Sequence, residues 1–161
     1  MWITRQTDYA TRAVLALALA GDDAPLKLRD LADRTSVPSA FLEQIMPQLR
    51  LAGIVRSERG PSGGYRLNHE PADITLERVV RVFQGQLAPI ACATRSAPEP
   101  CPMEVACSLK EVWTEVRDAT IAILERVSFA ELAQRAGGRW IDPSLPPPPD
   151  AVPVGGPAAR H

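Results

Sequence analysis

Apolar residues recur along the first third of the chain at the spacing of amphipathic α-helices. The first repeat covers residues 8–20, where Thr7 is placed to cap the helix N-terminus. A second repeat covers 28–35, and a third begins at Pro38, which suits the first turn of a helix because its missing N–H would have no partner there. The pattern predicts three successive helices.

The segment after the third repeat changes to the pattern of a short β-hairpin. Gly53 is placed to end the helix, and residues 54–57 and 65–67 are predicted strands on either side of a glycine-rich turn at 60–64. Two short helices separated by a few residues and followed by a hairpin are typical of a winged helix-turn-helix. A further helix is expected from Thr75 to a stop at Gly85, so we assign residues 1–85 to a DNA-binding domain.

The next segment has no periodicity and several prolines, and we predict a loop over residues 86–107. A Ser-x-x-Glu capping box at Ser108 opens a long amphipathic helix, and a second box at Ser128 opens a short terminal helix, so 108–136 forms one helical unit. Residues 137–161 are proline-rich and are predicted to be a disordered tail. The predicted fold class is mainly α with a two-stranded wing and a long C-terminal helix.

Charge is distributed unevenly along the chain. The formal net charge is −1, so any DNA-binding surface must be local. The wing carries a local excess of positive charge. The second helix of the predicted helix-turn-helix has polar residues on its outward face. The candidate DNA-binding residues are Ser39, Glu43, Gln44, Arg50, Arg56, Arg59, Gly60, Ser62 and Gly63.

Several function classes are disfavoured by what the sequence lacks. It has no apolar run long enough to span a bilayer and no signal-peptide pattern, so we expect a cytoplasmic protein with no membrane contact. It has no catalytic triad, no phosphate-binding loop and no histidine near its cysteines, so we do not expect an enzyme.

The three cysteines, Cys92, Cys101 and Cys107, all fall in the predicted loop or at its end. Their odd number and the absence of an export signal argue against a disulfide framework. Thiolates are soft ligands for zinc, copper(I) or iron–sulfur clusters, and the start of a helix beside Cys107 favours a deprotonated thiol. Spacing alone leaves metal binding, thiol redox chemistry and simple burial open.

Four segments together resemble the IscR and NsrR family of bacterial transcriptional regulators. They are the runs 3–10, 37–45, 51–55 and 59–65. The resemblance extends over about residues 1–136. It implies a homodimer that binds a dyad-symmetric double-stranded DNA operator, and it implies an iron–sulfur cluster held by the three cysteines.

The fourth cluster ligand expected in this chain differs from the one found in members resembling IscR. Members resembling IscR place a histidine three residues after the last cysteine, where this chain has Lys110. Members resembling NsrR use an aspartate of the other subunit near the start of the first helix, and Asp8 occupies the matching position. We therefore expect Cys92, Cys101, Cys107 and Asp8 to ligate a cluster, with [4Fe-4S] favoured over [2Fe-2S]. The alternative role of Asp8 is to stabilise the helix N-terminus.

The apolar face of the long helix exceeds what one small domain needs to bury, which predicts a dimer interface. Its expected residues are Val112, Trp113, Val116, Thr120, Ile123 and Leu124. The resulting hypothesis is a dimeric regulator, expected to be a repressor, whose cluster senses nitric oxide, redox state or iron supply. The alternative is a regulator of the same fold that senses a small molecule or thiol oxidation without a cluster.

Overall fold

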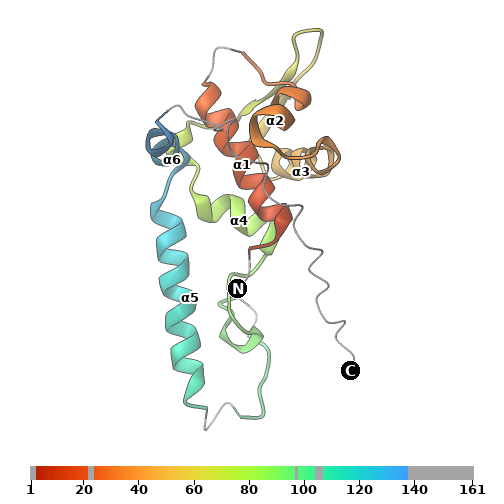
Figure 1. The fold of residues 1–161 in the computed structure, drawn as a ribbon. Helices are drawn as coiled ribbons and strands as arrows, with labels where there is room; N and C mark the ends of the chain where they lie inside the picture. Colours follow the sequence, from red (N-terminus) through yellow and green to blue (C-terminus); the bar gives the residue numbers. More distant parts are fainter. Residues whose placement is uncertain (1–2, 22–23, 97, 104–106, 138–161) are drawn as a thin grey trace.

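Helix α1 (Arg5–Ala20) lies at the centre of the computed structural model, which describes residues 3–21, 24–96, 98–103 and 107–137 (Figure 1). The helix has small side chains on its inner face, and Ala10, Ala13 and Ala16 are fully buried. Small residues let neighbouring backbones approach closely. Helices α2 (Leu28–Thr35), α3 (Ser39–Leu51), α4 (Leu76–Gln84) and α6 (Phe129–Ala136) all contact α1.

The turn between α2 and α3 is held by a buried hydroxyl group. The Thr35 hydroxyl donates to the Leu31 carbonyl at 2.6 Å and accepts from the Val37 amide at 3.3 Å. Between them, Ser36 adopts a left-handed conformation with φ of 53°, the single non-glycine residue with positive φ among the described residues. This turn sets the angle at which α3 leaves α2, so it sets the orientation of the predicted reading helix.

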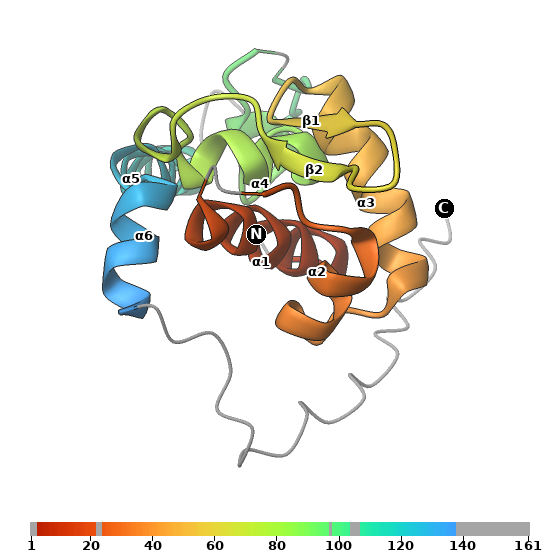
Figure 2. The same ribbon diagram turned by 90° about the horizontal axis from the view of Figure 1, so that it is seen from above.

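The wing is the antiparallel pair β1 (Val55–Glu58) and β2 (Gly64–Leu67), placed beside α3 (Figure 2). The fold is therefore mainly α-helical with a two-stranded sheet, as predicted. A 3₁₀ turn, η1 (Pro71–Asp73), leads from the wing into α4.

Helix α5 (Leu109–Arg126) runs from the far end of the structure back to α6 (Figure 1). Its C-terminal end is joined to the winged domain by backbone hydrogen bonds: Leu76 N–H donates to Val127 O at 2.8 Å, and Phe129 N–H donates to Ile74 O at 2.9 Å. Thr75 and Ser128 form a β-bridge between these bonds. Phe129 is fully buried in the main core, so α6 packs as part of the winged domain.

The observed helix caps agree only in part with those predicted from the sequence. Thr75 and Ser128 cap α4 and α6 as predicted, and Gly85 ends α4. The prediction for Thr7 is wrong: Thr4 caps α1, and Thr7 lies one turn inside, fully buried and hydrogen-bonded to Thr4. The capping box at Ser108 is also wrong, because Ser108 has helical φ and ψ and its side chain makes no capping bond.

The described residues of the predicted loop 86–107 include the 3₁₀ turn η2 (Ala91–Ala93), which carries Cys92 and contacts α5. Most of the predicted proline-rich tail, residues 138–161, lies outside the described residues. No helix in the described ranges is both long and apolar enough to cross a membrane.

Replacing Thr35 with valine tests the turn between α2 and α3. Thr35→Val keeps the shape of the side chain but leaves the buried Val37 N–H without its acceptor, so we expect a loss of about 1–3 kcal/mol in unfolding free energy by urea denaturation. Thr94→Val is the matched control, because the Thr94 hydroxyl makes a similar bond to Ala91 O at an exposed site. Equal losses in the two variants would contradict a special role for this turn.

Candidate nucleic-acid interface and cysteine loop

Helix α3 buries most of its large apolar residues and exposes its polar ones; the exception is Leu51 at its C-terminal end, which is 91% exposed. Leu42, Ile45, Met46 and Leu49 are fully buried against the core. Ser39, Glu43 and Gln44 are exposed, as the sequence predicts for residues that read base edges. The outer face of α3 thus offers hydroxyl, carboxylate and amide groups to solvent.

The base of the wing is fixed by a third strand-like segment. Leu26 forms a β-bridge with Tyr65 through hydrogen bonds of 3.0 and 2.8 Å. Gly64 is required at this crossing, because a Cβ there would lie 2.5 Å from the Leu26 carbonyl oxygen. The wing and the segment that enters α2 are therefore held together by main-chain contacts.

The tip of the wing is a tight turn that brings the backbone close to itself. Gly60 has φ of 110°, and its carbonyl accepts from Gly63 N–H at 2.9 Å. A Cβ on Gly63 would lie 2.3 Å from Glu58 O, so a side chain does not fit there. Arg59, Gly60 and Ser62 are exposed at this tip, where the sequence places DNA contacts.

Glu58 reduces the basic character that the sequence predicts for the wing. Its carboxylate lies 2.8 Å from Arg66 Nε and 3.8 Å from Arg56 Nε, and the strand register sets Arg56 opposite Arg66. Arg59 has no ion pair within the described part of the chain. Arg50 at the end of α3 approaches Ser57 Oγ at 3.5 Å, which places a second exposed guanidinium beside the wing.

The three cysteines are half-buried and form no disulfide. Cys92 lies on η2, Cys101 lies in the following loop, and Cys107 precedes the first residues of α5. Within the described ranges, no three His, Cys, Asp or Glu side chains gather closely enough to hold a metal ion. The single chain therefore places the cysteines in one region without bringing them together.

Asp8 lies in the first turn of α1 and belongs to no metal-binding group among the described residues. Its carboxylate pairs with Arg12 Nη2 at 2.8 Å, and its side chain is 42% exposed. Among the described residues Arg12 is its one ion-pair partner, and both side chains are partly exposed, so the carboxylate is accessible to a second subunit. The donor set also has suitable chemistry for an iron–sulfur cluster, since it consists of reduced thiols and one carboxylate.

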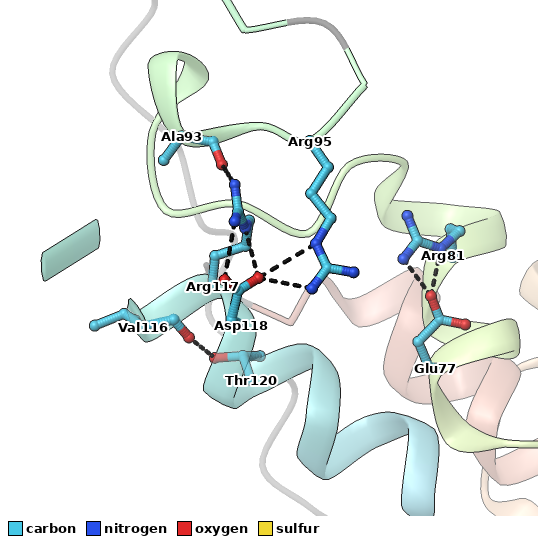
Figure 3. Close-up of polar contacts among 8 residues, drawn as sticks. All are labelled: Glu77, Arg81, Ala93, Arg95, Val116, Arg117, Asp118 and Thr120. Carbon is cyan, nitrogen blue, oxygen red and sulfur yellow. Dashed lines mark hydrogen bonds and ion pairs between the residues drawn. The ribbon is translucent and has the colours of Figure 1, made fainter. Parts of the chain in front are cut away.

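A polar cluster fastens the first part of the cysteine loop to the middle of α5 (Figure 3). The Arg117 guanidinium donates to Ala93 O and to both oxygens of Asp118, the latter at 3.0 Å. Arg95 Nη2 donates to Asp118 Oδ1 at 2.8 Å. We call Arg95, Arg117 and Asp118 the loop clamp; it holds the residues next to Cys92 on α5.

The loop clamp also perturbs its carboxylate. Hydrogen bonds from Arg117, and then from Arg95, lower the pKa of Asp118 below its ordinary value. Sequence reasoning missed this cluster. One signal was available: Arg117 lies one helical turn before Ile121, which packs inward together with Leu124, so an apolar residue is expected at position 117.

The residues predicted for the dimer interface divide between two faces of α5. Leu124 packs within its own chain beside Ile121, Val80 and Leu87, and Trp113 is half-buried. The outward face keeps large apolar side chains in solvent, with Val112, Val116 and Ile123 at 50%, 42% and 52% exposed and Leu109 at 59%. These four residues are called the outer stripe of α5, and Thr120 lies near it with its hydroxyl bonded to Val116 O.

The winged fold with its exposed reading helix defines a DNA-binding regulator, and comparison with known proteins gives the family. A family model described as Rrf2, iron-dependent transcriptional regulator, matches residues 3–135. The chain belongs to this family. It is a transcriptional regulator and not an enzyme.

Individual relatives agree with this assignment. An rrf2-like HTH-type transcriptional regulator of Rhodobacter capsulatus is 38% identical over 136 residues, covering 81% of this chain and 91% of the relative. The HTH-type transcriptional regulator IscR of Aliivibrio salmonicida is 31% identical over 132 residues, covering 82% and 77%.

Solved structures show the same fold. CymR, the global cysteine regulator of B. subtilis, superimposes with a TM-score of 0.69 at 29% identity, covering 84% of this chain and 98% of that chain. IscR of T. potens gives 0.67 at 28% identity, covering 84% and 88%. The oxidized form of Staphylococcus aureus CymR gives 0.64 at 25% identity, covering 88% and 99%.

The lowered pKa of Asp118 predicts that the loop clamp stabilises the fold until the pH becomes strongly acidic. A carboxylate whose folded pKa is depressed contributes stability above its unfolded value, near 3.8, and loses it as the pH falls through the lower folded value. The difference in Tm between the parent protein and Asp118→Asn is therefore expected to be constant from neutral pH down to mildly acidic pH and to shrink only in strong acid. A difference that vanishes already near neutral pH would contradict the loop clamp.

Proposed function

We propose that the chain acts as a cytoplasmic homodimer that binds a dyad-symmetric DNA operator. The supporting observation is the exposed polar face of α3 beside a wing whose tip presents Arg59. In this arrangement α3 enters the major groove, where Ser39, Glu43 and Gln44 contact base edges. The arginines beside and on the wing and the residues of its turn contact the DNA backbone or the minor groove; they are Arg50, Arg56, Arg59, Gly60, Ser62 and Gly63.

The outer stripe of α5 supports the dimer. Four large apolar side chains in one line along a helix are unfavourable in water, and a second copy of the helix covers them by a symmetric contact. Val112, Val116 and Ile123 then lie in the interface, with Thr120 and the half-buried Trp113 at its edge. Leu124 stays in the core of its own subunit.

We assign signal sensing to the cysteine loop. Cys92, Cys101 and Cys107 of one subunit and Asp8 of the partner subunit would hold an iron–sulfur cluster, with [4Fe-4S] favoured. When bound, such a cluster supplies a cross-subunit link that nitric oxide, oxygen or iron shortage breaks. This role is supported by the partly exposed Asp8 carboxylate, which would exchange its ion pair with Arg12 for the cluster when the loop of the other subunit approaches.

A continuous series of contacts links the cysteine loop to the winged domain that carries α3. The loop clamp couples the Cys92 segment to α5, and the backbone bonds at Val127 and Phe129 couple α5 to the winged domain. A loop tied to the partner subunit therefore fixes the spacing of the two copies of α3, and its release shifts the dimer away from the operator. The expected regulator is a repressor that loses DNA affinity with its cluster.

The second candidate is thiol oxidation without a cluster. It is favoured by the likeness to CymR, one structure of which is described as an oxidized form, and by the free, half-buried state of all three cysteines. Disulfide formation between two loop cysteines would restrain the same segment that the loop clamp holds.

Operator titration with anaerobically reconstituted protein separates the two candidates. The cluster hypothesis expects iron and sulfide in the preparation and at least about a tenfold loss of operator affinity when they are removed, a difference of about 1.4 kcal/mol. Cys101→Ser serves as the variant without a complete ligand set. If the iron-free protein instead loses affinity only after treatment with peroxide, and recovers it with a thiol reductant, the second candidate is supported.

Arg59 is expected to contact DNA more strongly than Arg66. Arg59→Ala should weaken binding of all DNA sequences and reduce the slope of log affinity against log salt by about 1, because one phosphate contact is lost. Arg66→Ala is the matched control, since Arg66 is 14% exposed and bound to Glu58 within the wing. A salt slope unchanged by Arg59→Ala would place the wing tip away from DNA.

Charge introduced on the outer stripe should break the dimer. Ile123→Glu buries an uncompensated carboxylate in each subunit and is expected to weaken association by at least about 100-fold, measured by analytical ultracentrifugation. Ala122→Glu adds the same charge at the neighbouring exposed position and should leave the dimer intact. Equal effects at 122 and 123 would argue against an interface built on the outer stripe.

A further inference from the structure

A small cavity lies where α4, the start of the cysteine loop and α5 meet. It measures about 30 Å³, roughly twice the space that one water molecule needs. Its polar lining consists of Arg81 from α4, Gln86, Thr94, Arg95 and Ser96 from the loop, and Arg117 from α5. Each of the three structural elements thus contributes one guanidinium group.

The charges around this cavity do not balance. Arg81 is paired with Glu77, while Arg95 and Arg117 share the single carboxylate of Asp118. Among these five side chains the net charge is therefore +1. Arg117 is only 12% exposed, so water screens its charge poorly.

The arginines also keep donors for a ligand. The contacts of Arg81 use Nε and Nη2, and those of Arg95 use the same two atoms, which leaves Nη1 of each without a partner among the described residues. Figure 3 shows the guanidinium groups of Arg81 and Arg95 pointing toward one another. Two cations that face each other across one cavity are stabilised when an anion lies between them.

We propose that this cavity binds a small oxyanion of the size of phosphate or sulfate. Guanidinium groups donate in a planar fork that matches two oxygens of such an anion, and the hydroxyl group of Ser96 adds a further donor at the rim. An anion held here would join Arg81 of α4 to Arg95 of the loop. It would add a second contact between the segment beside Cys92 and the winged domain, through Arg95, which also belongs to the loop clamp.

This site is independent of the proposed cluster and of the operator, because none of its residues is a cysteine or lies on α3 or the wing. Anion binding there would affect the cysteine loop in addition to the proposed cluster. Anion binding would stabilise the loop in its docked position whether or not a cluster is present.

Thermal unfolding in phosphate or sulfate, compared with chloride at equal ionic strength, tests the proposal. The parent protein should show a saturable rise in Tm of several degrees with at least one of the two anions. Arg95→Gln and Arg81→Gln should each abolish the rise. Arg135→Gln is the matched control and should retain it, because Arg135 forms an i, i+4 ion pair with Glu131 on α6, as Arg81 does with Glu77 on α4, and lies outside the cavity.

The position of the bound anion is checked by hydrogen exchange. Phosphate or sulfate should slow exchange in residues 86–96, and this protection should persist in Arg59→Gln, which removes the exposed arginine of the wing tip. A Tm rise that is equal in all four arginine variants, or that chloride reproduces, would show a general salt effect and would overturn the proposal. Protection confined to the wing would overturn it as well.

Discussion

The short backbone ladder between Ile74–Leu76 and Val127–Phe129 is the constraint on which the arrangement of the molecule depends. Helix α5 has few contacts with the winged domain other than those of α4, yet its C-terminal end is joined to that domain by main-chain hydrogen bonds and by the buried ring of Phe129. Main-chain bonds in a buried environment are costly to break, because both partners would lose their hydrogen bond without gaining one to water. The end of α5 and the entry to α4 must therefore move as one body.

The same helix is fastened at a second level by side chains. Arg117 and Asp118 hold Ala93 and Arg95 halfway along α5, so the cysteine loop follows the helix rather than the winged domain. The outer stripe faces away from both fastenings and remains available to another copy of the chain. In the proposed regulator, this division of faces lets one helix connect the proposed sensor loop, the proposed subunit contact and the winged domain.

The helices and the wing could be predicted from sequence because burial on α1, α3 and α4 follows the helical period and glycines mark the turns. The caps were harder, since Thr4 and Thr7 are chemically identical candidates three residues apart and only the start of the helix distinguishes them. The pairing of Glu58 with Arg66 depends on strand register, and the loop clamp joins residues that are more than twenty positions apart. Neither contact can be recognised from residues that are close together in the sequence. The fourth ligand that resemblance assigns to Asp8 involves a second subunit, which no pattern within one chain can locate.

Glu58 has a consequence for how the protein would search for its operator. The carboxylate binds Arg66 closely and lies 3.8 Å from Arg56, so it partly offsets the positive charge that the wing would offer to a DNA phosphate. Such an internal phosphate mimic lowers attraction to every stretch of duplex alike, because backbone contacts carry no sequence information. The proposed base contacts from α3 would not be weakened, so the ratio of operator affinity to bulk DNA affinity would rise. In a cell with a large excess of competing sites, that ratio governs occupancy more than affinity alone.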